Sequence, residues 1–191
     1  MRVSREQAAQ NRERIVDTAA RLFREKGADG IGVADLMKAA GLTHGGFYGH
    51  FDSKEALLGE AASRALDGAG DHWQAMMAQQ PGDALGAVVR SYLSPAHRDN
   101  PGQGCAISAL GADISRAGPA VRDAVTARAQ AQFALLAAAS PGSSDDERRR
   151  HAIATYAAMV GAMVLARAVS DEALSQEILA AVTATLVAPP A

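Results

Sequence analysis

The sequence predicts an all-α fold, and three observations support this. Apolar residues recur with the 3.6-residue period of amphipathic helices along nearly every segment of the 191-residue chain. The strict apolar-polar alternation of half-buried strands is absent from the sequence. Helix start and stop signals separate the periodic segments. With 48% hydrophobic and 21% charged residues, the composition is that of a folded globular protein.

The first two predicted helices lie before residue 42. The first begins at Ser4, whose spacing from Gln7 is that of a capping box, and it ends at Gly27. The second helix is short and covers about 33–40, and Gly41 ends it. The inward-facing positions of the second helix are Val33, Leu36 and Met37.

The later helices follow from the same signals. Asp52, with Glu55 three residues on, is an Asp-type capping box that starts a long helix reaching about Gln79. Ser144 and Glu147 form another capping box. The segment 94–104, rich in proline and glycine, is predicted to be a break between helices. Beyond residue 82 the predicted helices are 83–93, 105–117, 119–139, 144–169 and 171–187.

The charge of the chain is unevenly distributed, although the net charge is only −2. Residues 1–26 carry seven Arg or Lys against four acids, whereas residues 56–191 carry thirteen acids against ten bases. This asymmetry indicates that the amino end meets a polyanion. Ordinary solvated helix charges are the alternative interpretation.

The compartment and cofactors can also be predicted. A single cysteine excludes an internal disulfide and favours a reducing compartment. The amino terminus lacks the apolar core of a signal peptide, and the longest uncharged apolar run, 152–166, is too short to span a bilayer. We therefore expect a cytoplasmic protein with no membrane partner. Because His97 and His151 lack metal-ligand spacing, we assign no metal, and we expect no cofactor.

Residues 41–51, GLTHGGFYGHF, combine glycines with aromatic residues. Two short helices, 33–40 and 43–51, joined across 41–42, have the layout of a helix-turn-helix motif, whose second helix enters the major groove of DNA. On a helical projection Phe47 and Phe51 share one face. The opposite face carries Gly45, Gly46 and Gly49, and it is flanked by Tyr48 and His50. We expect buried phenylalanines and an outer face of bare backbone that can approach DNA closely. A glycine-rich surface loop with two buried aromatics is the alternative.

The stretch VADLMKAAGLTHGGFYGHFDSKEALL, residues 33–58, resembles the DNA-binding signature of the TetR family of transcriptional regulators. The resemblance covers about 10–58 and rests on Ala39-Ala40-Gly41, Tyr48, His50-Phe51 and Ser53-Lys54-Glu55. It implies an all-helical homodimer. Residues 1–52 would form a three-helix DNA-binding domain, and residues 53–191 a larger ligand-binding and dimerisation domain.

The resemblance also assigns roles to particular residues. Tyr48, His50 and Lys54 would contact phosphates, and Thr43 and His44 would begin the recognition helix near base edges, followed by Gly45 and Gly46. Glycine at 46 and 49, where the family usually carries side chains, predicts that this helix reads phosphates more than bases. Arg2 and Arg5 can reach phosphates or the minor groove.

Beyond residue 60 the resemblance is weaker. Gly104-Cys105 at a predicted helix start, followed by Ala109-Leu110 and Asp113, is similar to a subgroup of these regulators that includes thiol-based sensors. The helix dipole would favour the Cys105 thiolate there, although a lone cysteine also commonly fills a core gap. Further candidate ligand contacts, each of which can equally be core, are His72, Trp73, Met76, Phe133 and Tyr156.

The last two predicted helices carry apolar stripes suited to a dimer interface. Small residues beside the first stripe, Ala158, Gly161 and Ala162, would allow two helices to approach closely. Core packing within one chain is the alternative. The stripes consist of Ile153, Ala157, Val160 and Val164 on the first helix and of Leu174, Ile178, Val182 and Leu186 on the second.

The function predicted from these features is that of a ligand-responsive repressor. It would bind a palindromic operator in double-stranded DNA as a homodimer, and a small-molecule inducer of unknown identity or thiol modification would release it. Two alternatives remain. An enzyme with Cys105 as nucleophile lacks a convincing base, because the nearby His97 lies in a Pro/Gly-rich segment. A dimeric adaptor with a vestigial DNA-binding domain is favoured only by the glycines at 46 and 49. We therefore expect a protein that is not an enzyme.

Overall fold

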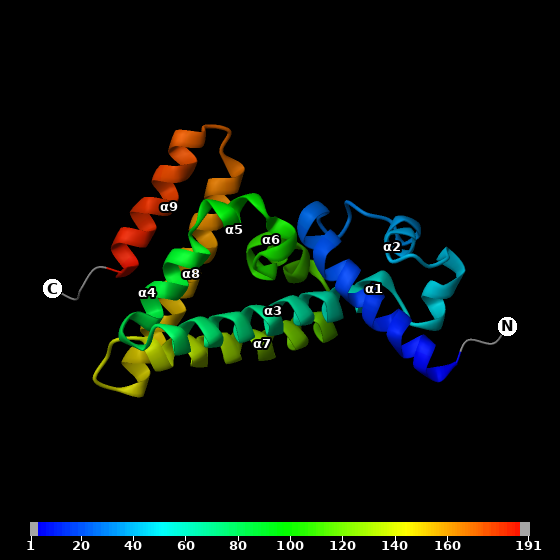
Figure 1. Ribbon diagram of the computed structural model, residues 1–191, viewed down its shortest axis with the longest axis horizontal. Helices are drawn as coiled ribbons and strands as arrows, with labels where there is room; N and C mark the ends of the chain where they lie inside the picture. Colours follow the sequence, from blue (N-terminus) through cyan, green and yellow to red (C-terminus); the bar gives the residue numbers. More distant parts are fainter. Residues whose placement is uncertain (1–3, 188–191) are drawn as a thin grey trace.

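The computed structural model describes residues 4–187, in which helices are joined by short loops and no strand occurs (Figure 1). The all-α prediction is confirmed. Arg2 lies outside the described residues. The helices, with short 3₁₀ helices marked η, are α1 (Arg5–Lys26), α2 (Val33–Ala39), η1 (His44–Gly49), α3 (Lys54–Gln79), η2 (Pro81–Asp83), α4 (Ala84–Tyr92), α5 (Pro95–Asp99), η3 (Pro101–Gln103), α6 (Ala106–Arg116), α7 (Pro119–Ala139), α8 (Asp145–Ala168) and α9 (Glu172–Val187).

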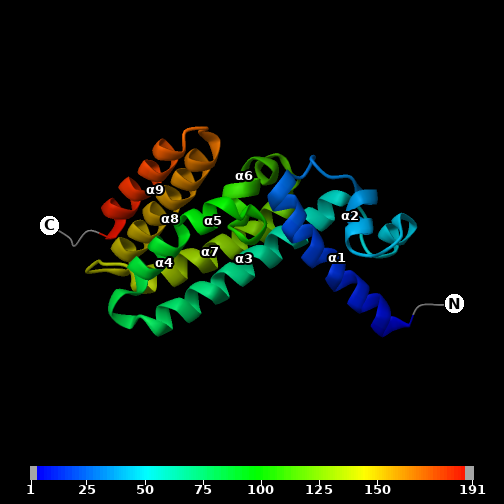
Figure 2. The ribbon, with the colours of Figure 1, turned by 45° about the horizontal axis from the view of Figure 1, so that its top comes forward.

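The molecule is elongated, with α1 and α2 at one end and α8 and α9 at the other (Figures 1 and 2). The long helices α3 and α7 run side by side between the two ends. Two hydrophobic cores follow this arrangement. The first lies among α1, α2, η1, the first half of α3, and α6, and its largest buried side chains include Phe23, Leu36, Phe47, Leu57 and Leu110. The second lies among the second half of α3, α4, α7, α8 and α9, around Trp73, Val88, Leu136, Met159 and Met163.

Most predicted helix ends are close to the observed ones, but the start of α3 is not the predicted one. The N-cap is Ser53, whose Oγ accepts a hydrogen bond from the Ala56 amide at 3.0 Å, so the capping box at Asp52 is wrong. The predicted partner Glu55 has another role. Its carboxylate accepts from the Gly118 amide at 2.6 Å, where the first amides of α7 lack helical partners. Glu55 therefore links the start of α3 to the start of α7.

The segment 94–104 was predicted to be a break, yet it contains α5 and η3. Ser94 caps α5 by accepting from the His97 amide at 3.2 Å, and Pro95 occupies the first turn, where a missing N–H costs nothing. Arg167 on α8 holds this short helix, because its guanidinium donates to the His97 and Arg98 carbonyls at 2.8 and 3.0 Å. Pro95, which was predicted to mark a break between helices, therefore marks the start of a short helix.

Candidate functional site

The residues predicted to meet DNA lie at the end of the molecule that carries α1, α2 and η1 (Figures 1 and 2). Arg5 begins α1 there and is exposed. Tyr48 is 69% exposed, and Thr43, His44 and Gly45 are also exposed. His50 and Lys54 are half-buried. These side chains come from the turn before η1, from η1 itself and from the start of α3.

Two phenylalanines anchor this surface. Phe47 and Phe51 are 0% and 3% exposed, and their ring centroids lie 5.7 Å apart. The Arg12 guanidinium lies 4.7 Å from the Phe51 ring centroid and donates to the Glu60 carboxylate at 2.6 Å. Tyr48 packs edge-on against Phe47 at 5.2 Å. The predicted burial of the two phenylalanines is therefore observed, and η1 is held to α1 and α3.

The glycine face differs from the prediction. The segment 43–51, predicted to be one helix, contains the six-residue 3₁₀ helix η1, which has about three residues per turn. Its tighter winding turns Gly46 inward, so that a Cβ there would lie 3.7 Å from Met37 Cε. An added Cβ at Gly45 or Gly49 would meet nothing within 4 Å. The bare outer face thus consists of Gly45 and Gly49, and the placement of Gly46 on it was wrong.

Lys54 is the first residue of α3, where its positive charge opposes the helix dipole. None of the ion pairs found within residues 4–187 includes Lys54. The ammonium group is therefore free to bind an anion beside η1.

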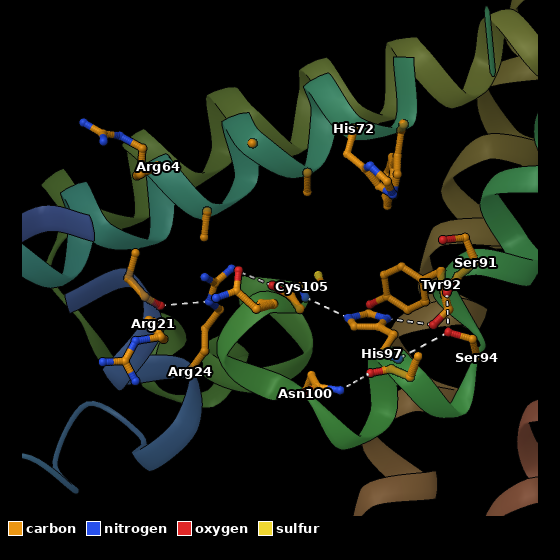
Figure 3. A pocket seen from close by; sticks show the side chains of 18 of the residues that line it. Arg21, Arg24, Arg64, His72, Ser91, Tyr92, Ser94, His97, Asn100 and Cys105 are labelled. Carbon is orange, nitrogen blue, oxygen red and sulfur yellow. Dashed lines mark hydrogen bonds between the residues drawn. The ribbon is translucent and has the colours of Figure 1, made fainter. Parts of the chain in front are cut away.

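A second candidate site is an open cavity of about 670 Å³ bordered by α1, α3, α4, α5 and the segment that leads into α6 (Figure 3). Among the predicted ligand contacts, His72, Trp73 and Cys105 line it. Met76, Phe133 and Tyr156 do not, and belong to the second core, where the Tyr156 ring packs against Trp73 at 5.6 Å and Phe133 at 5.7 Å. The part of the chain that the structure describes has no cluster of three or more His, Cys, Asp or Glu suited to a metal ion.

Cys105 is the N-cap residue of α6 and is 4% exposed. Its Sγ lies 3.4 Å from the Tyr156 hydroxyl, whose pKa is raised by burial. The Tyr92 hydroxyl is buried with no hydrogen-bond partner among the described residues. Burial likewise raises the pKa of Tyr92, so both phenols stay protonated. The thiol therefore lies beside neutral hydroxyl groups, and the Arg24 and Arg167 guanidinium groups are near enough to interact with it electrostatically.

His97 does not serve as a base for the thiol. Its Nε2 accepts a hydrogen bond from the Cys105 amide at 2.9 Å, so Nδ1 carries the proton and donates to the Tyr92 carbonyl at 2.7 Å. Burial lowers the pKa of His97, and the charges of Arg167 and Arg24 act in the same direction. The imidazole is thus a neutral structural link. This geometry does not support a nucleophilic role for Cys105.

The predicted dimer residues lie on α8 and α9, which pack side by side (Figures 1 and 2). Ala157, Gly161 and Val164 are exposed, whereas Val160, Ile178 and Val182 are half-buried against the second core. Ala162, predicted to face the partner, is 3% exposed and faces the interior instead. Leu165, which no sequence pattern singled out, is 56% exposed.

The exposed side of α8 is apolar along much of its length, with Ile153, Val164 and Leu165 all at least 39% exposed. Helix α8, which contains run 152–166, is long and apolar enough to cross a membrane by length and composition alone, and 39% of its most apolar stretch is buried. Buried helices of soluble proteins share these properties, so this is weak evidence.

Comparisons with known proteins bear on the family and on the fold. A family model described as "Bacterial regulatory proteins, tetR family" matches residues 15–61. The uncharacterized HTH-type transcriptional regulator Rv0196 of Mycobacterium tuberculosis is 30% identical over 169 residues, covering 84% of this chain and 86% of that protein. The regulator AcrR of Shigella flexneri is 34% identical over 92 residues, which span 48% of this chain and less than half, 42%, of AcrR. The crystal structure of reduced Escherichia coli NemR superposes with a TM-score of 0.76 at 24% identity, covering 95% of this chain and 100% of that one, and shows the shared fold.

Proposed function

Because the chain belongs to the TetR family of bacterial transcriptional regulators, whose members bind operators and small-molecule ligands and act as dimers, we propose that it is a ligand-responsive repressor. The proposal depends most on one arrangement. The short α2, the turn after it and the anchored η1 form a helix-turn-helix, and the unpaired Lys54 follows at the start of α3. We assign DNA binding to residues 1–52, and ligand binding and dimerisation to 53–191. The relatives are named as transcriptional regulators, which agrees with a protein that is not an enzyme. We place it in the cytoplasm, where the DNA is.

Retardation of genomic DNA fragments by the purified protein tests this function. A repressor retards a small set of fragments that contain a palindrome, whereas an adaptor with a vestigial DNA-binding domain retards none. Within this proposal Thr43, His44 and Gly45 approach base edges, Arg5 supports the contact, and Tyr48, His50 and Lys54 bind phosphates. Gly46, which is turned toward Met37, has no part in it.

Lys54→Ala should weaken binding to all DNA sequences about equally, because its ammonium group is proposed to contact phosphate rather than a base. Each lost phosphate contact should reduce the slope of log affinity against log salt by about 0.9, so we expect about one unit per bound protomer. Fluorescence anisotropy with operator and unrelated DNA at several salt concentrations measures both effects.

Lys26→Ala is the matched control, since Lys26 is exposed in the last turn of α1, at the end that contacts α6. It removes the same charge and should leave the salt slope nearly unchanged. If Lys54→Ala behaved like Lys26→Ala, the phosphate assignment would be wrong.

We further propose that release from DNA is caused by a non-covalent ligand of the cavity rather than by thiol modification. Cys105 is 4% exposed, and His97 does not activate its thiol. Iodoacetamide should therefore leave the native thiol largely unmodified and DNA binding intact, while the unfolded chain reacts fully, as mass spectrometry would show. Cys105→Ser is the control for reaction elsewhere. Rapid alkylation of the native protein together with loss of DNA binding would instead establish Cys105 as the sensor.

A further inference from the structure

Arg24, on the last turns of α1, is a cation in the cavity wall that has no carboxylate partner. Its Nε donates to the Ala20 carbonyl at 2.8 Å and its Nη1 to the Gly104 carbonyl at 2.7 Å (Figure 3). None of the ion pairs within residues 4–187 includes Arg24. Its Nη2 has no hydrogen bond to any described residue, so the guanidinium retains donors for another group.

The other arginines of the cavity wall are neutralised. Arg21 pairs with Glu25 at 3.0 Å on the same helix, and Arg64 on α3 pairs with Glu13 and Asp17. Asp17 is the one carboxylate among the described lining residues, and it already forms an ion pair with Arg64. The unpaired positive charge in this wall therefore belongs to Arg24.

One part of the wall, formed by α3 and the end of α4, is suited to an apolar body. Trp73 and Tyr92 line the cavity with their rings 6.1 Å apart, and Ala65 and Ala69 on α3 lie along the same wall. Pockets that combine aromatic walls with one charged group bind small molecules by burying an apolar body and fixing a single polar end. A guanidinium with free donors favours a carboxylate or a similar oxyanion as that end.

We propose that the cavity binds a small organic anion, with its carboxylate or equivalent oxyanion on Arg24 and its apolar body against Trp73. This inference rests on the proposed function, because the anion would be the effector that releases the regulator from DNA. An alternative occupant, a neutral hydrophobic molecule, would leave the Arg24 charge unpaired.

The same geometry gives the bound anion a route to the DNA-binding helices. The Gly104–Cys105 peptide group is bonded at both ends: its carbonyl accepts from Arg24 on α1, and its N–H donates to His97 on α5. The peptide group packs closely against the His97 ring, since a Cβ on Gly104 would lie 2.5 Å from His97 Nε2. An anion that also engages Nη1 of Arg24 competes with the Gly104 carbonyl, and so weakens a bond that holds α1 to the segment before α6.

The first test measures ligand binding without DNA. Trp73 is the single tryptophan, and it lines the cavity, so its fluorescence reports occupancy directly. The probes are matched acid and amide pairs: phenylacetate, 3-phenylpropanoate and 2-naphthoate with their neutral amides. We expect at least one acid to bind at least about tenfold more tightly than its amide, the range of a charge-assisted hydrogen bond. If no acid bound more tightly than its amide, the inference would be overturned.

Two variants of α1 assign the preference to one residue. Arg24→Gln should abolish the preference for the acid, whereas Arg21→Gln, on the same helix and the same wall, should keep it because Arg21 is already paired. Arg24→Lys keeps the charge and should retain part of the preference, and circular dichroism verifies that each variant is folded. An acid preference that survives in folded Arg24→Gln would refute the role of Arg24.

The second test adds DNA. The preferred acid should release the wild-type protein from a fragment selected from random DNA. Arg24→Gln, which lacks the bond to Gly104, should bind that fragment more weakly even without the acid, and the acid should change its DNA binding at least about tenfold less than that of the wild type. Acid binding without DNA release would overturn the coupling. If the protein bound no DNA at all while Trp73 still preferred the acids, the proposed repressor function would fail and the anion site would stand.

Discussion

Replacing Phe47 with alanine should unfold the DNA-binding end at much lower denaturant concentration and abolish DNA binding. Phe47 is fully buried in the first core, between Phe51 and the residues of α2. Truncating a buried phenylalanine typically costs about 3–5 kcal/mol through lost burial and the cavity that remains. No neighbouring residue of η1 can fill the space left by the Phe47 ring, because Gly45 and Gly49 have no side chains and face open space.

Denaturant unfolding followed by circular dichroism measures the stability, and fluorescence anisotropy measures DNA binding. Tyr48→Ala is the matched control, because Tyr48 is 69% exposed and packs only edge-on against Phe47. It should cost at most about 1.5 kcal/mol of stability while still weakening DNA binding. If Phe47→Ala kept wild-type stability, η1 would not be anchored through this ring.

The helices were predictable where periodicity and a local stop or start signal coincide. The segment 119–139 was predicted with the bounds that α7 has, because Pro119 at its start and a Ser-Pro-Gly break after it agree with the apolar pattern. The start of α3 was misplaced because Asp52 and Ser53 are both good N-caps. In the structure Ser53 accepts from the Ala56 amide, and Glu55, the expected partner of Asp52, instead accepts from Gly118, 63 residues away. Local pattern cannot supply such a distant contact.

The cavity was only partly predictable for the same reason. Size and polarity selected His72 and Trp73, which line it, but also Met76, Phe133 and Tyr156, which do not. Cys105, which also lines it, was selected by its place at a helix start and by the family resemblance. Arg24 was passed over, because its bond to Gly104 joins residues 80 positions apart. In the sequence Arg24 is one of seven basic residues in the first 26, and only burial without a carboxylate sets it apart.

The exposed apolar side of α8 is the feature from which we infer the dimer interface. A second copy of the chain, packing α8 and α9 against their counterparts, would cover Ile153, Val164 and Leu165 by a two-fold arrangement. A palindromic operator then needs this dimer, because its two half-sites lie about one helical turn of DNA or more apart. Loss of the dimer should therefore appear as loss of operator binding.

Gly161→Leu should weaken dimerisation and, with it, DNA binding. Within one chain a Cβ on Gly161 meets nothing within 4 Å, so the new side chain is tolerated by the folded protomer and can clash only with a partner. Overfilling a close helix contact costs about 1–3 kcal/mol, and two copies meet at a two-fold interface, so the dimer dissociation constant should rise at least about tenfold. Sedimentation velocity over a concentration series measures this.

The control is Gly70→Leu. Gly70 lies on α3, where an added Cβ also meets nothing within 4 Å, so this variant should leave the dimer intact. A Gly161→Leu protein that sedimented as the wild-type dimer would place the interface on another surface.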